Sequence, residues 1–323
     1  MTKPLLITHA NMRRADRPGH ITFCEIDSFA RIINARTSRD ARVIDVSDAR
    51  SVNESLDEPF DIVVFATLSS DPDVKDLALR ADKLFVVLPD PNWALDVDFG
   101  RPDYTLVTPF QALEQSVDPI SMLIDTINAN IPGSPDHVFL PFGEMALHDR
   151  KYLSLFMSSR SVDHLLPILQ PEYVYAGSLK PNRAQIMADM AATGELSVFG
   201  NFTAEDLDSW RTKGVGRKET LEDNTMGYVP AMSVWRLYSD YDSALMISDP
   251  QMTALRTHYM RPLEYALAGA RIEIRGTDPE SVEADKSYYG AYIIDDSTGR
   301  ASISKIKSCY TFGFVDRLRA LVD

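Results

Sequence analysis

One stretch of the chain combines a glycine, a hydroxyl and two cations in a way that suits phosphate binding. It reads YAGSLKPNR and covers Tyr175–Arg183. Gly177 allows a phosphate to approach the backbone, and Ser178 offers a hydroxyl beside the free N–H groups at the start of the following helix. Lys180 and Arg183 add positive charge, and an arginine can bind a phosphate through two parallel hydrogen bonds. A strand, a turn and a helix with surface cations would give the same pattern.

Two later segments extend this pattern toward a nucleotide. In VFGN a strand ends at Phe199 and Gly200 follows, and open α/β sheets bind ligands beyond such strand ends. Gly-Asn is also a common turn pair. In RPLE, Arg261 and Glu264 are three residues apart and share one face of a helix. The arginine could hold a diphosphate and the glutamate could accept both hydroxyls of a ribose, although an exposed ion pair would read the same way.

A candidate general base lies in the first half of the chain. Asp90 directly follows an apolar run in the segment LPDPNW, and a carboxylate at the end of a buried strand can accept a proton from a substrate. An aspartate between two prolines can equally be a turn former. No serine lies in a Gly-x-Ser-x-Gly elbow, and the histidines show no metal-ligand spacing, so the sequence predicts neither a hydrolase triad nor a zinc site.

Two loops gather cations within an acidic chain. They hold Arg13, Arg14, Arg17 and His20 in one case, and Lys213, Arg217 and Lys218 in the other. The net charge of −14 and the pI of about 4.9 argue against a protein that binds nucleic acid through its overall charge. Phosphate contacts depend on nearby cations, so the two loops could still contact a nucleic-acid backbone. The alternative interpretation is that both are ordinary solvent-exposed loops with no nucleic-acid partner.

The elements that must position these residues are short apolar runs alternating with helical patterns. In the first half the expected strands are Pro4–Thr8, Ala41–Val46, Asp61–Ala66, Lys83–Leu88, Tyr104–Thr108 and His137–Leu140, with helices over Ile26–Asn34 and Val74–Ala81. The runs are rich in Val, Ile and Leu and do not alternate with polar residues, which is typical of parallel strands buried on both faces. This pattern predicts a doubly wound α/β sheet.

The same pattern starts again in the second half. Its expected strands are Tyr173–Ala176, Leu196–Phe199, Gly227–Val229, Ala244–Ile247 and Arg271–Ile274, and its helices are Arg183–Thr193 and Arg261–Leu267. We therefore expect two Rossmann-like domains, residues 1–167 and 168–311. The amphipathic segment Phe312–Asp323 should form a helix that packs back on the first domain.

Composition narrows the class of protein. The chain has 323 residues, of which 45% are hydrophobic and 25% charged, as in soluble globular proteins. It has no long apolar run and no signal-peptide pattern, so we expect no membrane span. Two cysteines exclude a disulfide framework and favour a reducing, cytoplasmic setting.

The order of the motifs is more specific than any one of them. YAGSLKPNR, VFGN, GYVP, ALMI and RPLEYALAGA follow one another as in the donor domain of GT-B glycosyltransferases. Within that class the chain resembles the DNA beta-glucosyltransferases of T-even bacteriophages, which have a Tyr-Gly-Gly-Ser-Phe-Arg loop, a Phe-Phe-Gly-Asn turn, an Ile-Pro pair and an Arg-x-x-Glu helix in this order. FDIVVFATLSS, LFVVLPDPNWAL and HVFLPFGEMAL extend the likeness into the first half.

The resemblance implies a GT-B fold, with two Rossmann-like doubly wound domains facing a central cleft. Residues 1–167 would lie on the acceptor side and residues 168–311 would bind the nucleotide sugar. The implied donor-binding residues are Gly177, Ser178, Lys180, Arg183, Phe199, Gly200, Val229, Pro230, Arg261 and Glu264. Among them, Val229 and Pro230 would hold the uracil, and Glu264 the ribose. Ala176 replaces the first glycine of the family's pair, and the loop before Arg183 is one residue shorter.

The implied activity is transfer of a sugar from a UDP-sugar to a hydroxylated or hydroxymethylated pyrimidine in double-stranded DNA. Asp90 would act as the general base, and direct displacement predicts inversion at the anomeric carbon. Arg13, Arg14, Arg17, His20, Lys213, Arg217 and Lys218 would contact the DNA. A GT-B enzyme with a small-molecule, glycan or protein acceptor is the alternative, and a non-catalytic nucleotide-binding protein on the same scaffold is a third.

The same resemblance sets expectations for the setting of the reaction. The UDP-sugar is the co-substrate, no cofactor is required, no protein residue binds a metal, and a magnesium effect is compatible with the pattern. The partner would be DNA with modified bases and not a membrane. We expect a monomer in the cytoplasm, which is the host's if a phage carries the gene.

Overall fold

The computed structural model describes residues 3–9, 21–91, 97–149, 173–177, 183, 186–187, 189–190, 196–199, 238, 241, 243–258, 261–309 and 313–323. The chain divides into two compact units. Unit 1 comprises Met1–Leu153, Ala254–Met260 and Thr311–Asp323, and unit 2 comprises Ser154–Thr253 and Arg261–Tyr310.

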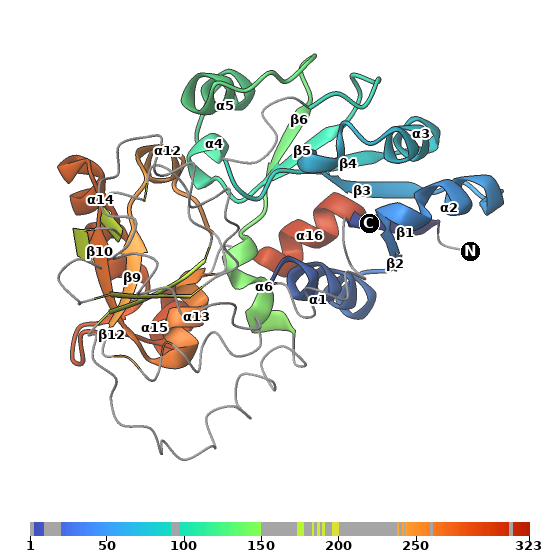
Figure 1. The fold of residues 1–323 in the computed structure, drawn as a ribbon. Coiled ribbons are helices and arrows are strands. Elements are labelled where there is room, and N and C mark those ends of the chain that lie inside the picture. The colour runs from blue at the N-terminus through green and yellow to red at the C-terminus, as the bar shows by residue number, and fades with distance from the viewer. Residues whose placement is uncertain are drawn as a thin grey trace. The chain divides into compact units, whose positions relative to one another are not determined.

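Unit 1 is built on a six-stranded parallel sheet with the order β2-β1-β3-β4-β5-β6. The strands are β1 (Pro4–His9), β2 (Asp40–Asp45), β3 (Asp61–Phe65), β4 (Leu84–Val87), β5 (Thr105–Thr108) and β6 (Asp136–Phe139). The helices are α1 (Ile21–Arg36), α2 (Ala49–Ser55), α3 (Pro72–Arg80), α4 (Gln111–Glu114), α5 (Pro119–Ile127), α6 (Phe142–His148) and α16 (Phe314–Val322), with single 3-10 turns at Val46–Asp48 and Ala66–Leu68. Figure 1 shows α3 on one side of this sheet and α1 and α16 on the other.

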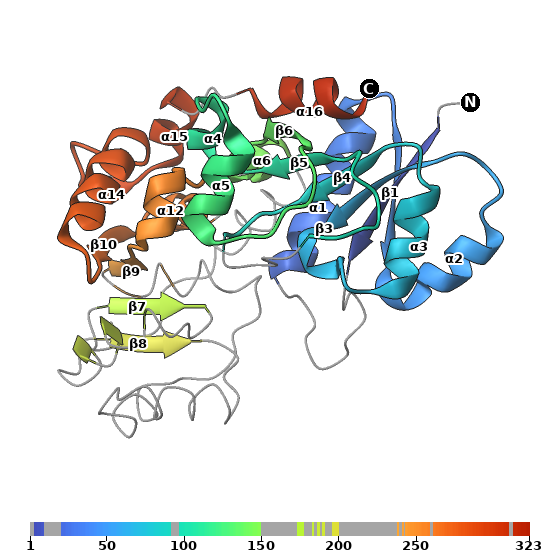
Figure 2. The same ribbon diagram turned by 90° about the horizontal axis from the view of Figure 1, so that it is seen from above.

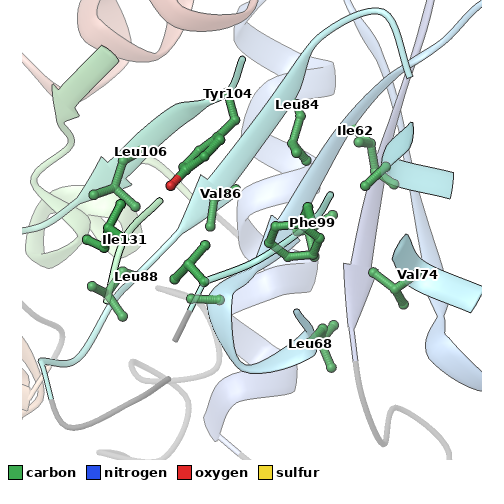
Figure 3. Packing of buried hydrophobic residues seen from close by; sticks show 14 of the residues in the cluster. Ile62, Leu68, Val74, Leu84, Val86, Leu88, Phe99, Tyr104, Leu106 and Ile131 are labelled. Carbon is green, nitrogen blue, oxygen red and sulfur yellow. The ribbon is translucent and has the colours of Figure 1, made fainter. Parts of the chain in front are cut away.

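The core of unit 1 explains why its strands read as continuous apolar runs. Ile62, Leu84, Val86 and Leu106 come from three neighbouring strands, are almost fully buried and pack in one cluster with Val74 of α3 (Figure 3). Successive side chains of a strand point to opposite faces of the sheet. The residues between them therefore face the other layer of helices, and both faces of the sheet are apolar.

The C-terminal helix α16 packs against α6 and α1. Its N-cap, Gly313, has a left-handed backbone with φ 73° and offers no side chain. Glu144 of α6 supplies the missing acceptor, because its buried carboxylate takes a hydrogen bond of 3.1 Å from the backbone N–H of Phe314. The His148 ring stacks on Phe314 with centroids 5.8 Å apart. A carboxylate from one helix thus caps another.

Unit 2 contains a second parallel sheet, which among its described strands has the order β10-β9-β7-β8. Its strands are β7 (Tyr173–Ala176), β8 (Leu196–Phe199), β9 (Ser243–Ile247) and β10 (Arg271–Arg275), and a short antiparallel pair follows, β11 (Ile294–Asp295) and β12 (Arg300–Ala301). Its helices include α13 (Arg261–Ala268), α14 (Pro279–Tyr292) and α15 (Ile303–Cys309). Figure 2 shows β7 and β8 running side by side.

Helix α12 (Pro250–Leu255) carries the chain from unit 2 into unit 1. The described residues 254–258 are held there by backbone contacts: Thr257 forms a β-bridge with Phe110, and the backbone N–H of His258 donates to the carbonyl of Pro109 at 2.8 Å. Leu255 is fully buried in the core cluster of unit 1. The chain then returns to unit 2, where α13 begins at Arg261.

The predicted strands that fall on described residues are present, with ends that differ by one residue at most. The helix expected over Phe312–Asp323 is present as α16 in unit 1. Helix α14 was not predicted. Its buried residues are Ser281, Asp285 and Tyr289, so its inner stripe is largely polar and shows no apolar period. The strand expected at Gly227–Val229 lies outside the described residues.

Candidate nucleotide-sugar site

The strand order of unit 2 marks where a ligand would bind. Strand β7 is followed by β8 on one side, and β9 lies on its other side. In open α/β sheets the crevice beyond the carboxyl ends at such a reversal is the usual ligand site. Here that edge carries Gly177 directly after β7 and Ser248 directly after β9.

Two arginines contact one tyrosine near the end of β7. The Tyr175 side chain is 1% exposed. The Nη1 of Arg183 donates a hydrogen bond of 3.1 Å to its hydroxyl, and the Arg261 guanidinium lies over its ring, 5.5 Å from the centroid. A phenol oxygen accepts from a cation and a ring face attracts one, so Tyr175 favours both arginines at once.

These two cations change the acidity of the phenol. Burial raises the pKa of Tyr175, but the charges and hydrogen bonds of Arg183 and Arg261 lower it by more, to about 8. A group that can carry negative charge near neutral pH therefore lies beside two positive ones. A diphosphate would find the same complementary charge.

The backbone conformation at Gly177 favours glycine, and its Cβ position faces two side chains. Its φ is 154°, and a Cβ there would lie 2.7 Å from Nη2 of Arg261 and 3.2 Å from the Tyr175 hydroxyl. Its N–H donates to the carbonyl of Phe199 at 2.9 Å, which ties β7 to β8. Ala176, where the phage family has a glycine, is the last residue of β7 and is buried, so its methyl group is accommodated in the sheet.

Glu264 is buried one turn into α13. It is 4% exposed, which excludes the exposed ion pair that the sequence also allowed. Burial raises its pKa from 4.5 to about 7, although the positive charge of Arg261 works in the opposite direction. Near neutral pH this carboxyl can therefore be either an acid or a hydrogen-bond acceptor.

Arg183 does not lie on the surface, which excludes for this residue the alternative of a surface cation. It is 7% exposed, and besides Tyr175 its Nη2 contacts the sulfur of Met252 at 3.7 Å. These two contacts hold the Arg183 guanidinium beside Tyr175 within unit 2. Phe199, the last residue of β8, is half-buried and makes an edge contact with Tyr241, with ring centroids 6.2 Å apart.

Asp90 lies in unit 1, in the turn that follows β4, and is half-buried. This is the carboxyl edge of the six-stranded sheet, where β1 ends at His9 and β3 at Phe65. The rings of His9 and Phe65 make an edge contact of 6.5 Å. A carboxylate in this place can accept a proton from a hydroxyl bound at the edge of the sheet.

Several predicted residues lie outside the described part of the chain. They are Ser178, Lys180, Gly200, Val229 and Pro230 of the donor set, and Arg13, Arg14, Arg17, His20, Lys213, Arg217 and Lys218 of the two basic loops. Where the chain is described, no cluster of His, Cys, Asp or Glu could hold a metal ion. Within the same residues, no helix is long and apolar enough to cross a membrane.

No protein-family model and no curated protein matches the chain. Solved structures do match it. A DNA-modifying beta-glucosyltransferase, solved with and without uridine diphosphoglucose, aligns over 99% of this chain and 92% of its own with a TM-score of 0.57 and 14% identity. The chain shares the fold of that enzyme.

Two further structures align over most of the chain at lower similarity. The UDP-N-acetylglucosamine 2-epimerase of Rickettsia bellii covers 99% of this chain and 96% of its own, with a TM-score of 0.41 and 13% identity. The MnaA–UDP complex of S. aureus covers 99% and 95%, with a TM-score of 0.43 and 9% identity.

The prediction of a GT-B fold, made of two Rossmann-like units with parallel sheets, is therefore confirmed. The structure brings Gly177, Arg183, Arg261 and Glu264 to one strand edge and helix start. No sequence motif assigns a role to Tyr175, the residue on which both arginines converge. A tyrosine within an apolar strand is usually a core residue, and only its place one step before the expected ligand loop could have singled it out.

Proposed function

We propose that this protein transfers a sugar from a UDP-sugar to a hydroxyl group on a modified pyrimidine base in DNA. The observation that carries the proposal is the convergence of Arg183 and Arg261 on Tyr175 at the carboxyl edge of β7. Two cations at the reversal point of a parallel sheet match a diphosphate.

The remaining parts of a nucleotide have candidate partners in unit 2. Arg261 opens α13, so its charge adds to the free N–H groups at that helix start. Glu264 follows on the same helix, and its carboxylate would accept the two ribose hydroxyls. Ser178 and Lys180 would add to the diphosphate site, Phe199 and Gly200 would line the crevice, and Val229 and Pro230 would hold the uracil.

Asp90 would serve as the general base. It would take the proton of the acceptor hydroxyl as that oxygen forms a bond to the anomeric carbon. The bond from that carbon to the diphosphate breaks, and its electron pair leaves with UDP. Arg183, Arg261 and Lys180 would stabilise the charge that develops on the leaving group. Direct displacement predicts inversion, and no step needs a metal, although magnesium could assist the diphosphate.

A DNA acceptor is supported by the resemblance of the motifs and by the fold shared with a DNA-modifying enzyme. The two basic loops, Arg13–His20 and Lys213–Lys218, would contact its phosphates. Residues 1–167 would form the acceptor side and 168–311 the donor side of a central cleft, in a cytoplasmic monomer. The net charge of −14 favours a second candidate, the same donor chemistry with a small-molecule, glycan or protein acceptor.

An acceptor screen tests this proposal. Labelled UDP-sugars are supplied with DNA that contains hydroxymethylated pyrimidines, with unmodified DNA as the control. Transfer to the modified DNA alone supports the proposal, and transfer only to another acceptor supports the second candidate. If UDP neither binds nor raises the melting temperature, the donor assignment is wrong.

Asp90→Asn tests the base. Turnover should fall at least about a hundredfold with unchanged UDP affinity, because general-base catalysis contributes factors of that order. Asp98→Asn is the matched control, since Asp98 is an exposed residue of unit 1 that bonds to Lys75 and the Gly100 N–H. Full turnover in Asp90→Asn would show that another group takes the proton.

A further inference from the structure

We propose that Tyr175 is a positioning residue that holds Arg183 and Arg261 together for the donor diphosphate, and that its ionised form competes with the diphosphate for them. This inference rests on the proposed function, because it assumes a diphosphate at this strand edge. It assigns a role to a buried phenol that the reaction itself does not use.

The geometry of three neighbouring groups supports the positioning role. The Tyr175 hydroxyl is 3.1 Å from Nη1 of Arg183, and Arg261 covers the ring of the same residue. The Cβ direction of Gly177 points at both Nη2 of Arg261 and the Tyr175 hydroxyl, at 2.7 Å and 3.2 Å. Two guanidinium groups repel each other, so a group that binds both is needed to keep them close.

The same contacts allow the phenol to become an anion. Among the described residues, the charges that act on it are those of Arg183 and Arg261, and together they bring the pKa of Tyr175 to about 8 despite its burial. Within the part of the chain that the structure describes, the other titratable groups of this region include Tyr238, whose pKa burial raises well above 10, Tyr265, which interacts with Tyr238, and Glu264, which interacts with Arg261. A phenolate beside the two arginines would neutralise part of the positive charge that a bound diphosphate would otherwise neutralise.

The sign of the effect follows from this competition. A bound diphosphate disfavours the phenolate and raises the pKa of Tyr175, so binding takes up a proton wherever the phenol is ionised. Affinity for UDP should therefore fall as the pH rises above about 8, by up to ~10-fold per pH unit. Below that range the ionisation of Glu264, with a pKa of about 7, should strengthen ribose binding as the pH rises. Affinity should be highest between these two values.

Tyr175→Phe separates this role from ordinary packing. The UDP affinities of the wild type and the variant are measured by calorimetry from pH 6.5 to 9.5, which begins and ends about 1.5 units from a pKa of about 8. The variant should bind about 10-fold more weakly at pH 7, because a hydrogen bond to a charged group is lost, and it should lose the fall above pH 8. Tyr173→Phe, on the same strand and half-buried, should match the wild type.

A spectroscopic measurement gives an independent readout. The difference in tyrosinate absorbance between the wild type and Tyr175→Phe should show one phenol that ionises near pH 8. Saturating UDP should move that ionisation to higher pH. A merely structural tyrosine would show neither effect.

The outcomes distinguish this inference from the proposed function. If UDP binds the wild type, but Tyr175→Phe shows equal affinity and the same fall at high pH, the role of Tyr175 is wrong and the donor site stands. Inorganic pyrophosphate probes the arginine pair without a nucleotide. Suppose that pyrophosphate binds, that its affinity falls at high pH only when Tyr175 is present, and that UDP does not bind. The proposed function is then wrong and the role of Tyr175 stands. If neither binds, both are wrong.

Discussion

Replacing Glu264 with glutamine should stabilise the protein at alkaline pH while weakening its affinity for UDP. The folded protein raises the pKa of this carboxyl from 4.5 to about 7, mainly through burial. Between these two values the folded state binds more protons than the unfolded state. Stability therefore decreases as the pH rises through this window, and the full cost is present above pH 7.

The size of the effect follows from the shift. A change from 4.5 to about 7 corresponds to about 3 kcal/mol at about 1.4 kcal/mol per pKa unit. Because Glu264 is 4% exposed, solvent does not screen this cost appreciably. Glutamine has a similar shape but no charge, so the variant should recover up to ~3 kcal/mol above the window and little below it.

Urea unfolding of the wild type and Glu264→Gln, each at pH 5 and 8.5, measures this difference. The free energy of unfolding of Glu264→Gln minus that of the wild type should be larger at pH 8.5, and the comparison cancels groups that titrate equally in both proteins. Glu283→Gln is the matched control, since Glu283 is exposed on α14. An equal difference at both pH values would refute the raised pKa.

Glu264→Ala should also weaken UDP binding more than it slows chemistry, and unchanged affinity would refute its ribose role.

Two further predictions concern the stability of unit 1. Burial lowers the pKa of His258 from 6.5 to about 3. Between these two pH values the unfolded state binds more protons than the folded state, so stability decreases as the pH falls below 6.5. The loss of stability approaches about 5 kcal/mol near pH 3. His258→Gln should flatten this dependence in an acid-unfolding series, and an unchanged slope would contradict the lowered pKa. Glu144→Ala should cost about 1–3 kcal/mol, because it leaves the buried N–H of Phe314 without its acceptor. The control Glu114→Ala removes a partly exposed ion pair with Arg317 and should cost less than about 1 kcal/mol of stability. If Glu144→Ala and Glu114→Ala lowered the free energy of unfolding equally, Glu144 would not be the helix cap.

The strands could be predicted because their signal is strong and local. A parallel strand buried on both faces needs an unbroken apolar run, and segments such as DIVVF and LFVV have no other simple interpretation. Helix α14 lacked that signal. Its buried stripe includes Asp285, which accepts hydrogen bonds from Ser248 and Thr253 at 2.7 and 3.0 Å. Those partners are 37 and 32 residues away in the sequence, so no local pattern reveals that an aspartate there is buried.

The candidate site was only partly predictable for the same reason. Motif order placed Gly177, Arg183, Arg261 and Glu264 near a nucleotide, because strand ends and helix starts can be read from the chain. It could not show that Arg183 would be buried, or that Arg261 would lie over the Tyr175 ring. Arg261 is 86 positions from Tyr175 by their numbers (261 − 175), and only the folded chain brings them together.

The passage of Ala254–Met260 through unit 1 has a consequence for how this protein could be recombined. The chain leaves unit 2 at Thr253 and re-enters it at Arg261, so unit 2 is not one continuous stretch of gene. A chimera that exchanged the whole stretch from Ser154 to Tyr310 as one insert would also exchange Leu255, which belongs to the core of unit 1. Unit 2 would therefore have to be transplanted as two inserts, with the native Ala254–Met260 segment left in place between them.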